Sequence, residues 1–175
     1  GVAVQVPEWN ADTCIQCNQC AFVCPHATIR PFALTEAEMA AAPAQTKHIP
    51  VKGKVGADMQ YVLAVSPLDC MGCGLCAIQC PTDSLTMMPI ADELGEQPVF
   101  DYCVKDVARK EELEGTSVKA SQFKRPLLEF SGSCAGCAQT SYARLVTQLF
   151  GDRMYIANAT GCSSIWGGPA ATSPD

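Results

Sequence analysis

With 175 residues, the chain is long enough for one ordinary domain, or for a small domain followed by part of another. Hydrophobic residues make up 48% and charged residues 17%, which excludes a disordered chain, and a net charge of −6 without clustered Lys and Arg excludes a nucleic-acid-binding surface. No apolar run approaches the roughly 20 residues that cross a bilayer, and no basic-then-apolar leader opens the sequence, so we expect no membrane segment and a cytoplasmic protein.

The first motif in chain order is a run of four cysteines that occurs twice. Residues 14–25 read CIQCNQCAFVCP and residues 70–81 read CMGCGLCAIQCP, at a constant offset of 56 residues. Cysteines separated by two or three residues are poorly placed to form disulfides with one another, but they suit thiolates that converge on one metal centre. The repeat predicts two related halves, each a loop of ligands followed by a short helix and a strand.

In two-cluster ferredoxins, each 4Fe–4S cluster takes three cysteines from one run and the last cysteine of the other. This rule predicts a first cluster on Cys14, Cys17, Cys20 and Cys80. It predicts a second cluster on Cys70, Cys73, Cys76 and Cys24. Pro25 and Pro81 are expected to start the short helices, because a first helical residue needs no N–H. Zinc sites use separated pairs of cysteines, so zinc does not account for these eight thiols.

The segment between the runs, residues 32–60, is expected to be an insertion. Residues 35–42 (TEAEMAAA) predict a short helix with a capping box between Thr35 and Glu38. The remainder predicts a loop and then a strand, at residues 49–60 and 61–65.

After the second run the composition changes. Residues 91–126 are polar and charged, and they predict a surface connector that includes a helix over residues 101–114. A strand, a helix and a second strand are then expected at residues 127–130, 138–150 and 154–157. The helix should end with Gly151 at its C′ position, and its apolar face comprises Tyr142, Leu145, Val146 and Leu149. A strand–helix–strand order is the start of a parallel α/β sheet.

Three more cysteines follow these two expected strands. Cys134 and Cys137 come after the first strand in SGSCAGC, and Cys162 comes after the second in TGCSS. Because ligands bind at the carboxyl ends of the strands in such sheets, we expect the three thiols to converge on a third cluster site that lacks one ligand. A zinc site or free thiols is the alternative.

Two further residues each carry two interpretations. Cys103, the remaining cysteine, is favoured as a lone structural thiol over the missing ligand of the third site. His26 directly follows the first run, and a surface or helix-capping role is favoured over one in tuning a cluster.

Taken together, the motifs resemble pyruvate:ferredoxin oxidoreductase. The resemblance is carried by the two CxxCxxCxxxCP runs, LLEFSGSCAGC, a helix that ends in QLFG, and IANATGCSSIWGG. It implies an α+β ferredoxin-like two-cluster domain at residues 1–100, a connector at 101–126, and the beginning of an α/β parallel-sheet thiamine-diphosphate-binding domain at 127–175. The third domain would be incomplete, so we expect a fragment of a longer enzyme.

This family decarboxylates pyruvate oxidatively with coenzyme A and passes electrons from thiamine diphosphate through 4Fe–4S clusters to ferredoxin or flavodoxin. The resemblance implies that Cys134, Cys137 and Cys162 hold the cluster nearest thiamine, with a fourth ligand outside this chain. It also implies Mg²⁺ and a homodimer in the parent enzyme. Residues expected near thiamine diphosphate are Gln139, Thr160, Gly161 and Cys162.

The sequence departs from the family at Gln139, where an acidic residue is common, and it lacks the Gly-Asp-Gly…Asn element that holds the metal and diphosphate. We therefore expect an electron-transfer segment that is not catalytic alone. A stand-alone two-cluster electron carrier is the alternative function.

Overall fold

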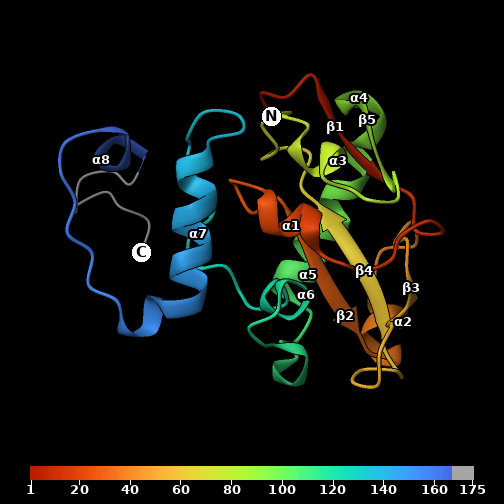
Figure 1. The fold of residues 1–175 in the computed structure, drawn as a ribbon. Coiled ribbons are helices and arrows are strands. Elements are labelled where there is room, and N and C mark those ends of the chain that lie inside the picture. Colours follow the sequence, from red (N-terminus) through yellow and green to blue (C-terminus); the bar gives the residue numbers. More distant parts are fainter. Residues whose placement is uncertain (167–175) are drawn as a thin grey trace.

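A computed structural model describes residues 1–166 of the chain (Figure 1). Within this part, the strands form two antiparallel sheets. The first sheet pairs β1 (Gln5–Trp9) with β5 (Leu85–Pro89). The second carries β4 (Gln60–Val65) between β2 (Ile29–Leu34) and β3 (Ile49–Pro50). Residues 167–175, the end of the third expected domain, lie outside the described residues.

Each sheet joins a strand of one half of the repeat to a strand of the other. Trp9 pairs with Leu85 in the first sheet, and Ile29 pairs with Val65 in the second. Because β1 and β4 precede the two cysteine runs while β2 and β5 follow them, this pairing brings the end of each run beside the start of the other. The repeat therefore folds as one α+β ferredoxin-like unit with interlocked halves.

A short helix within each run carries its third cysteine. These helices are α1 (Gln19–Val23) and α3 (Leu75–Ile78). The expectation that Pro25 and Pro81 start the helices is wrong, because each helix ends before the last cysteine and the proline lies in the turn that follows. The helices are instead preceded by left-handed N-cap residues, Asn18 at φ 61° and Gly74 at φ 74°.

The insertion contains helix α2 (Glu36–Ala41), and its predicted capping box is confirmed. The Glu38 N–H donates to Thr35 Oγ1 at 3.3 Å, and the Thr35 N–H donates to the Glu38 carboxylate at 2.8 Å. Strand β4 confirms the strand expected at residues 61–65. The loop expected over residues 49–60 is correct apart from the two-residue strand β3.

The segment expected to be a surface connector instead contributes to the core. Helix α4 (Ile90–Glu93) and a 3₁₀ turn (Leu94–Glu96) lead into α5 (Gln97–Lys105), so the helix expected over residues 101–114 begins and ends earlier. Pro98 lies in the first turn of α5, where its missing N–H costs little. The buried residues of α5 pack on β2 and β4 and are Val99, Phe100 and Cys103. Cys103 is fully buried, as a structural thiol should be.

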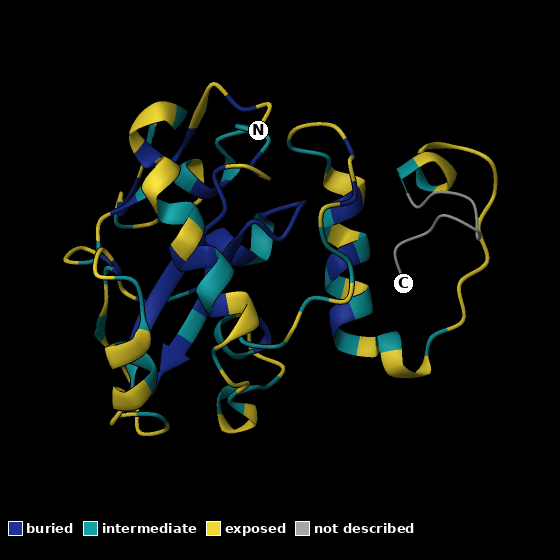
Figure 2. Ribbon diagram, turned by 180° about the vertical axis from the view of Figure 1, so that it is seen from behind, coloured by how far each residue is buried: buried dark blue, intermediate teal, exposed yellow. Residues whose placement is uncertain are grey.

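Charged residues after α5 offer no apolar face and do not extend the helix. They form a 3₁₀ turn (Glu111–Leu113), and a short helix α6 (Val118–Ser121) follows. Figure 2 shows that burial concentrates in the sheets and in the helices packed on them. Across residues 1–166, every helix falls short of the length and apolarity that a membrane crossing requires.

In the third segment, helix α7 (Ala138–Phe150) confirms the expected helix, but both expected strands are wrong. Residues 127–130 and 154–157 are irregular. A strand must share its backbone hydrogen bonds with a neighbour, and no strand of the described chain pairs with either segment. The described residues after α7 form a 3₁₀ turn (Gly151–Arg153) and helix α8 (Cys162–Trp166), so the expected parallel sheet is not formed there.

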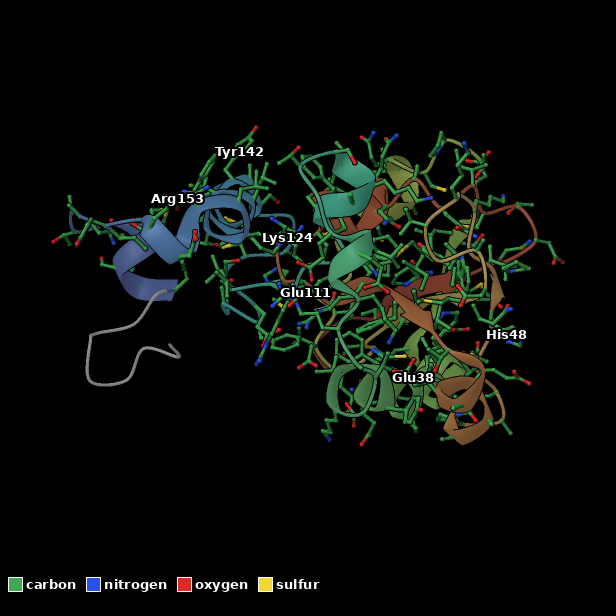
Figure 3. All side chains as sticks on the ribbon, turned by 90° about the horizontal axis from the view of Figure 1, so that it is seen from below. Glu38, His48, Glu111, Lys124, Tyr142 and Arg153 are labelled. Carbon is green, nitrogen blue, oxygen red and sulfur yellow. The ribbon has the colours of Figure 1, made fainter. Side chains whose placement is uncertain are left out.

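Helix α7 packs on the ferredoxin-like unit through polar residues, not through its apolar face. The residues of α7 that are buried are Thr140, Arg144 and Gln148. On the apolar face, Tyr142 is 70% exposed and points outward (Figure 3), and Val146 is 44% exposed. The apolar face of α7 is thus left largely uncovered by the described chain.

Gly151 does not occupy a left-handed C′ position. It is the C-cap of α7 with φ −57°, a helical value open to any residue. A Cβ atom at this position would lie 2.7 Å from Leu127 Cδ1. The glycine therefore allows close packing of Leu127 against the end of α7.

Candidate metal centres

Two small cavities are each lined by four cysteines. The first is lined by Cys14, Cys17, Cys20 and Cys80, with Trp9, Tyr61, Leu63 and Leu85 in its wall. The second is lined by Cys24, Cys70, Cys73 and Cys76, with Pro7, Ile29, Leu75 and Met87 in its wall. The structure brings together the two sets that the spacing of the runs assigns to two clusters. That these sets bind iron stays a prediction.

The thiols line the wall of each cavity at separate positions and do not converge on a single point. All 12 cysteines are free, without a disulfide. Within residues 1–166, no three Cys, His, Asp or Glu side chains converge as the ligands of a single ion do. A 4Fe–4S cluster binds its thiolates through separate iron atoms, so its ligands line a cavity in this manner.

The electrostatics of the cavities fit a cationic metal centre. Burial, followed by the nearby charge of Cys76, raises the pKa of Cys20. Burial, followed by the charges of Cys24 and Cys70, raises the pKa of Cys76 to about 12. Thiolates packed this closely away from water repel one another, and they are disfavoured unless a cation compensates them. Iron bound by the four sulfurs would supply that charge.

Backbone N–H groups point at sulfur at matching positions of the two runs. The Gln16 N–H donates to Cys14 Sγ, and the Gly72 N–H donates to Cys70 Sγ, both at 3.4 Å. Gln16 and Gly72 are 56 residues apart, and both adopt positive φ, at 59° and 70°. Such hydrogen bonds to ligand sulfur stabilise negative charge on a cluster and tune its potential.

At two left-handed positions, the first cysteine run has residues with side chains where the second run has glycines. Gln16 and Asn18 hold the left-handed conformations that Gly72 and Gly74 hold in the second run. Gln16 Nε2 donates to the Pro50 carbonyl and Gln16 Oε1 accepts from the Lys52 N–H, both at 2.7 Å.

Asn18 is fixed in the same way by residues from outside the run. Its Oδ1 accepts from the Tyr61 hydroxyl at 2.7 Å, and its Nδ2 donates to the Lys119 carbonyl at 2.8 Å. The insertion and the segment around α6 therefore hold the first cysteine loop in place. Sequence reasoning missed this role of Gln16 and Asn18, although the repeat aligns them with two glycines.

His26 is a buried residue of the second cavity, so its favoured surface or helix-capping role is wrong. It is 3% exposed and lines this cavity, and its Nε2 has no hydrogen-bond partner among the described residues. Burial lowers the pKa of His26, while the backbone of Cys134 acts in the opposite direction. The residue at the matching position, Thr82, lines the first cavity. An unpaired ring nitrogen beside the thiols fits a cavity that holds a sulfur-rich centre.

Side chains of α7 cap the C-terminal end of α1. Arg144 Nη2 donates to the Ala21 carbonyl at 2.5 Å and to the Phe22 carbonyl at 2.8 Å. Ser141 Oγ donates to the Val23 carbonyl at 3.1 Å. Helix α1 joins Cys20 of the first set to Cys24 of the second, so α7 is docked on the element that links the two cavities. The stripe of Thr140, Arg144 and Gln148 at four-residue spacing is the sequence signal for this docking.

The third cysteine group is not assembled into one site by the described residues. Cys134 and Cys137 share a turn, in which the Cys137 N–H donates to the Cys134 carbonyl at 3.1 Å. Hydrogen bonds from Thr140 lower the pKa of Cys137, which is the N-cap of α7. Cys162 is exposed at the start of α8. The turn lies against the second run, since a Cβ at Gly136 would be 3.4 Å from Cys73 Cβ.

The residues expected near thiamine diphosphate lie on the exposed surface. Gln139, in the first turn of α7, accepts a hydrogen bond from Trp166 Nε1 at 3.4 Å. Gly161 donates its N–H to Ser164 Oγ at 3.0 Å, and Thr160 precedes it in an exposed loop. The contact between Gln139 and Trp166 links α7 to α8. A role for these residues with a cofactor stays a prediction.

Comparison with known proteins gives a family match for part of the chain and similar proteins for nearly all of it. Residues 13–84 match the family model described as "4Fe-4S dicluster domain". The chain is 50% identical over 177 residues to the pyruvate:ferredoxin oxidoreductase of Moorella thermoacetica. It is 52% identical over 176 residues to the pyruvate-flavodoxin oxidoreductase of Klebsiella pneumoniae.

A third relative is named as a different enzyme. The chain is 49% identical over 178 residues to the pyruvate dehydrogenase (NADP+) of Cryptosporidium parvum. Each of the three alignments covers 99% of this chain, but only 15%, 15% and 9% of the respective relatives. The resemblance to pyruvate:ferredoxin oxidoreductase is thereby confirmed, and it concerns a small part of each enzyme.

Proposed function

We propose that this chain is the electron-transfer segment of a pyruvate:ferredoxin or pyruvate:flavodoxin oxidoreductase. The observation that carries the proposal is the pair of cavities lined by four cysteines each, in the cross-ligated order of two-cluster ferredoxins. When bound, 4Fe–4S clusters take up and release electrons one at a time, which side chains do not do. High identity to pyruvate oxidoreductases over nearly the whole chain supports the choice of parent enzyme.

The chain's own residues would hold, shield and tune the clusters. The eight cysteines of the two runs are the ligands, and apolar residues such as Trp9 and Leu85 keep water from the first set. The N–H groups of Gln16 and Gly72 hydrogen-bond to ligand sulfurs. A cytoplasmic location is part of the proposal, because 12 free thiols suit a reducing compartment.

The remaining proposals concern the parent enzyme. Residues 127–175 would complete an α/β thiamine-diphosphate-binding domain together with further sequence, and Gln139, Thr160 and Gly161 would approach the thiamine with its Mg²⁺. A third cluster would take three ligands from this chain, Cys134, Cys137 and Cys162. Pyruvate and coenzyme A would be substrates, ferredoxin or flavodoxin the electron acceptor, and the enzyme a homodimer.

The first test is anaerobic reconstitution of the chain with iron and sulfide. We expect about 8 iron atoms per chain and, after reduction with dithionite, an electron paramagnetic resonance spectrum of two spin-coupled clusters. Uptake of about 12 would mean that the third site assembles within this chain. Failure to take up iron, or a colourless zinc-loaded protein, would refute the two-cluster assignment.

A second test separates electron transfer from substrate binding in the full-length enzyme. Cys17→Ala and Cys73→Ala each remove one ligand from a different set. We expect both variants to lose ferredoxin reduction while they retain pyruvate and thiamine diphosphate binding, measured by calorimetry. If pyruvate binding disappeared together with ferredoxin reduction, the residues would not serve electron transfer alone.

A further inference from the structure

Helix α7 buries an arginine that has no carboxylate partner. Arg144 is 3% exposed, and its hydrogen bonds go to the Ala21 and Phe22 carbonyls and to the neutral Gln122 side chain. None of the ion pairs in residues 1–166 includes it, and its Nε has no hydrogen-bond partner there. Arginine stays charged in proteins, and a buried unpaired charge is strongly disfavoured.

A ligand of the second cluster set is close to this charge. Arg144 binds the carbonyls at the end of α1, and α1 leads directly into Cys24, two residues after Phe22. The charge of a Cys24 thiolate acts on both Arg144 and Arg30. Arg30 is paired with Glu129 and so brings no net charge. Of these two arginines, only Arg144 places an uncompensated positive charge at the C-terminal end of α1.

We propose that Arg144 raises the reduction potential of the second cluster by placing a fixed positive charge beside Cys24. A reduced cluster carries one more negative charge than an oxidised one, so a buried cation favours the reduced form. The inference rests on the proposed function, because it requires a cluster in the second cavity. Arg144 belongs to α7, the helix that follows the Cys134–Cys137 turn. The docking of α7 on the ferredoxin-like domain therefore sets the reduction potential of a cluster in that domain.

The test compares two substitutions at Arg144 in the reconstituted chain of 175 residues. Arg144→Gln removes the charge, whereas Arg144→Lys keeps the charge and loses the planar fork of donors. Gln148→Met removes hydrogen bonds from α7 to the Ser121 and Lys124 carbonyls, so it weakens the same docking without a change of charge. Arg153→Gln is the control, since Arg153 is exposed and paired with Asp152.

The readout is the midpoint potential of each cluster, from a redox titration followed by electron paramagnetic resonance. For Arg144→Gln we expect one of the two potentials to fall by the equivalent of about tenfold in the ratio of reduced to oxidised cluster, or about 59 mV for one electron. Arg144→Lys, Gln148→Met and Arg153→Gln should stay within a small fraction of that shift. The iron content of every variant is measured alongside.

Several outcomes would overturn the proposal. An unchanged potential in an iron-loaded Arg144→Gln variant would show that the charge has no effect on either cluster. Equal shifts in Arg144→Gln and Arg144→Lys, or a shift in Gln148→Met, would indicate that packing and not charge is responsible. If Arg144→Gln lost its iron, the other two variants would decide. A midpoint potential that is unchanged in Arg144→Lys but shifted in Gln148→Met would count against the proposal. Absence of clusters from the unmodified chain would instead refute the proposed function itself.

Discussion

At the residue scale, left-handed backbone conformation at four positions shapes the two cysteine loops, and at two of them, Gln16 and Gly72, the N–H donates to a cysteine sulfur. Gly72 and Gly74 in the second run, and Gln16 and Asn18 in the first, all have positive φ. For a residue with a side chain, this conformation costs roughly 1–2 kcal/mol. The first run offsets that cost with hydrogen bonds between the buried side chains of Gln16 and Asn18 and partners in the insertion, at Tyr61 and at Lys119.

The two glycines of the second run allow a matched prediction. Gly74→Ala introduces only the left-handed strain, since no described atom lies within 4 Å of the added Cβ. Gly72→Ala adds a clash, because its Cβ would lie 3.0 Å from the Gln5 carbonyl oxygen and 3.2 Å from Ala3 Cβ. We expect about 1–2 kcal/mol of destabilisation for Gly74→Ala and roughly 1–3 kcal/mol more for Gly72→Ala.

The measurement is the temperature at which the iron-loaded chain loses its cluster absorbance. Both variants should lose it at lower temperature than the unmodified chain, and Gly72→Ala at the lower of the two. If both variants lost their absorbance at the same temperature, the contact between residue 72 and the strand before the first run would not affect stability.

At the scale of elements, Glu38 connects the insertion to the segment after α5. Its carboxylate accepts from the Thr35 N–H at 2.8 Å, from the Ala108 N–H at 2.9 Å and from the Lys110 ammonium at 2.9 Å. Burial acts to raise the pKa of Glu38, but the hydrogen bonds from Thr35, Lys110 and Ala108 outweigh it and lower that pKa. A lowered folded-state pKa means that the carboxylate stabilises the fold above the unfolded-state value of about 4.3.

Glu38→Gln tests this connection. We expect a loss in the free energy of unfolding of roughly 1–3 kcal/mol, because the change removes the carboxylate partner of the partly buried Lys110 ammonium and weakens the capping box. The loss should be constant between pH 6 and pH 8, since stabilisation by Glu38 disappears only as the pH falls through its lowered folded pKa. Thermal unfolding followed by circular dichroism measures it, and Glu36→Gln, on the exposed first turn of α2, is the control. An equally large loss of stability in Glu36→Gln would indicate a general effect of charge on the helix.

The outcome for each element shows which information the sequence contains. The capping box of α2 and the helix α7 were predictable because their signals are local: Thr35 with Glu38, and thirteen residues without a helix breaker. The strands expected at residues 127–130 and 154–157 were wrong because strand formation depends on a partner that a local pattern does not reveal. The packing of α5 was missed because Val99, Phe100 and Cys103 are embedded among charged residues.

The candidate site divides in the same way. The grouping of eight cysteines into two sets follows from spacing alone, because a repeated ligand run leaves few arrangements. The roles of Gln16, His26 and Arg144 depend on contacts across about 30 to 120 residues of sequence, and no motif encodes them. Only the alignment of the two halves points to Gln16, through its match with Gly72.

At the scale of the whole molecule, exchange of the last cysteine between the halves couples the two cavities. The antiparallel pairing of β1 with β5 and of β2 with β4 places Cys80 beside the first run and Cys24 beside the second. Neither half can complete a set of four alone. The fold therefore makes each cluster depend on both halves of the chain, and double substitutions can test this dependence.

Cys80→Ala should remove the first cluster although Cys80 belongs to the second run, leaving about 4 iron atoms per chain and no spin coupling. Because Cys14 and Cys80 line the same cavity, Cys14→Ala combined with Cys80→Ala should lose no further iron. Cys70 lines the other cavity, so Cys70→Ala combined with Cys80→Ala should lose nearly all of it. Iron analysis and electron paramagnetic resonance of the reduced proteins provide the readout. If instead the Cys70 and Cys80 pair left one cluster intact while the Cys14 and Cys80 pair left none, each run would hold its own cluster and the exchange of ligands would be disproved.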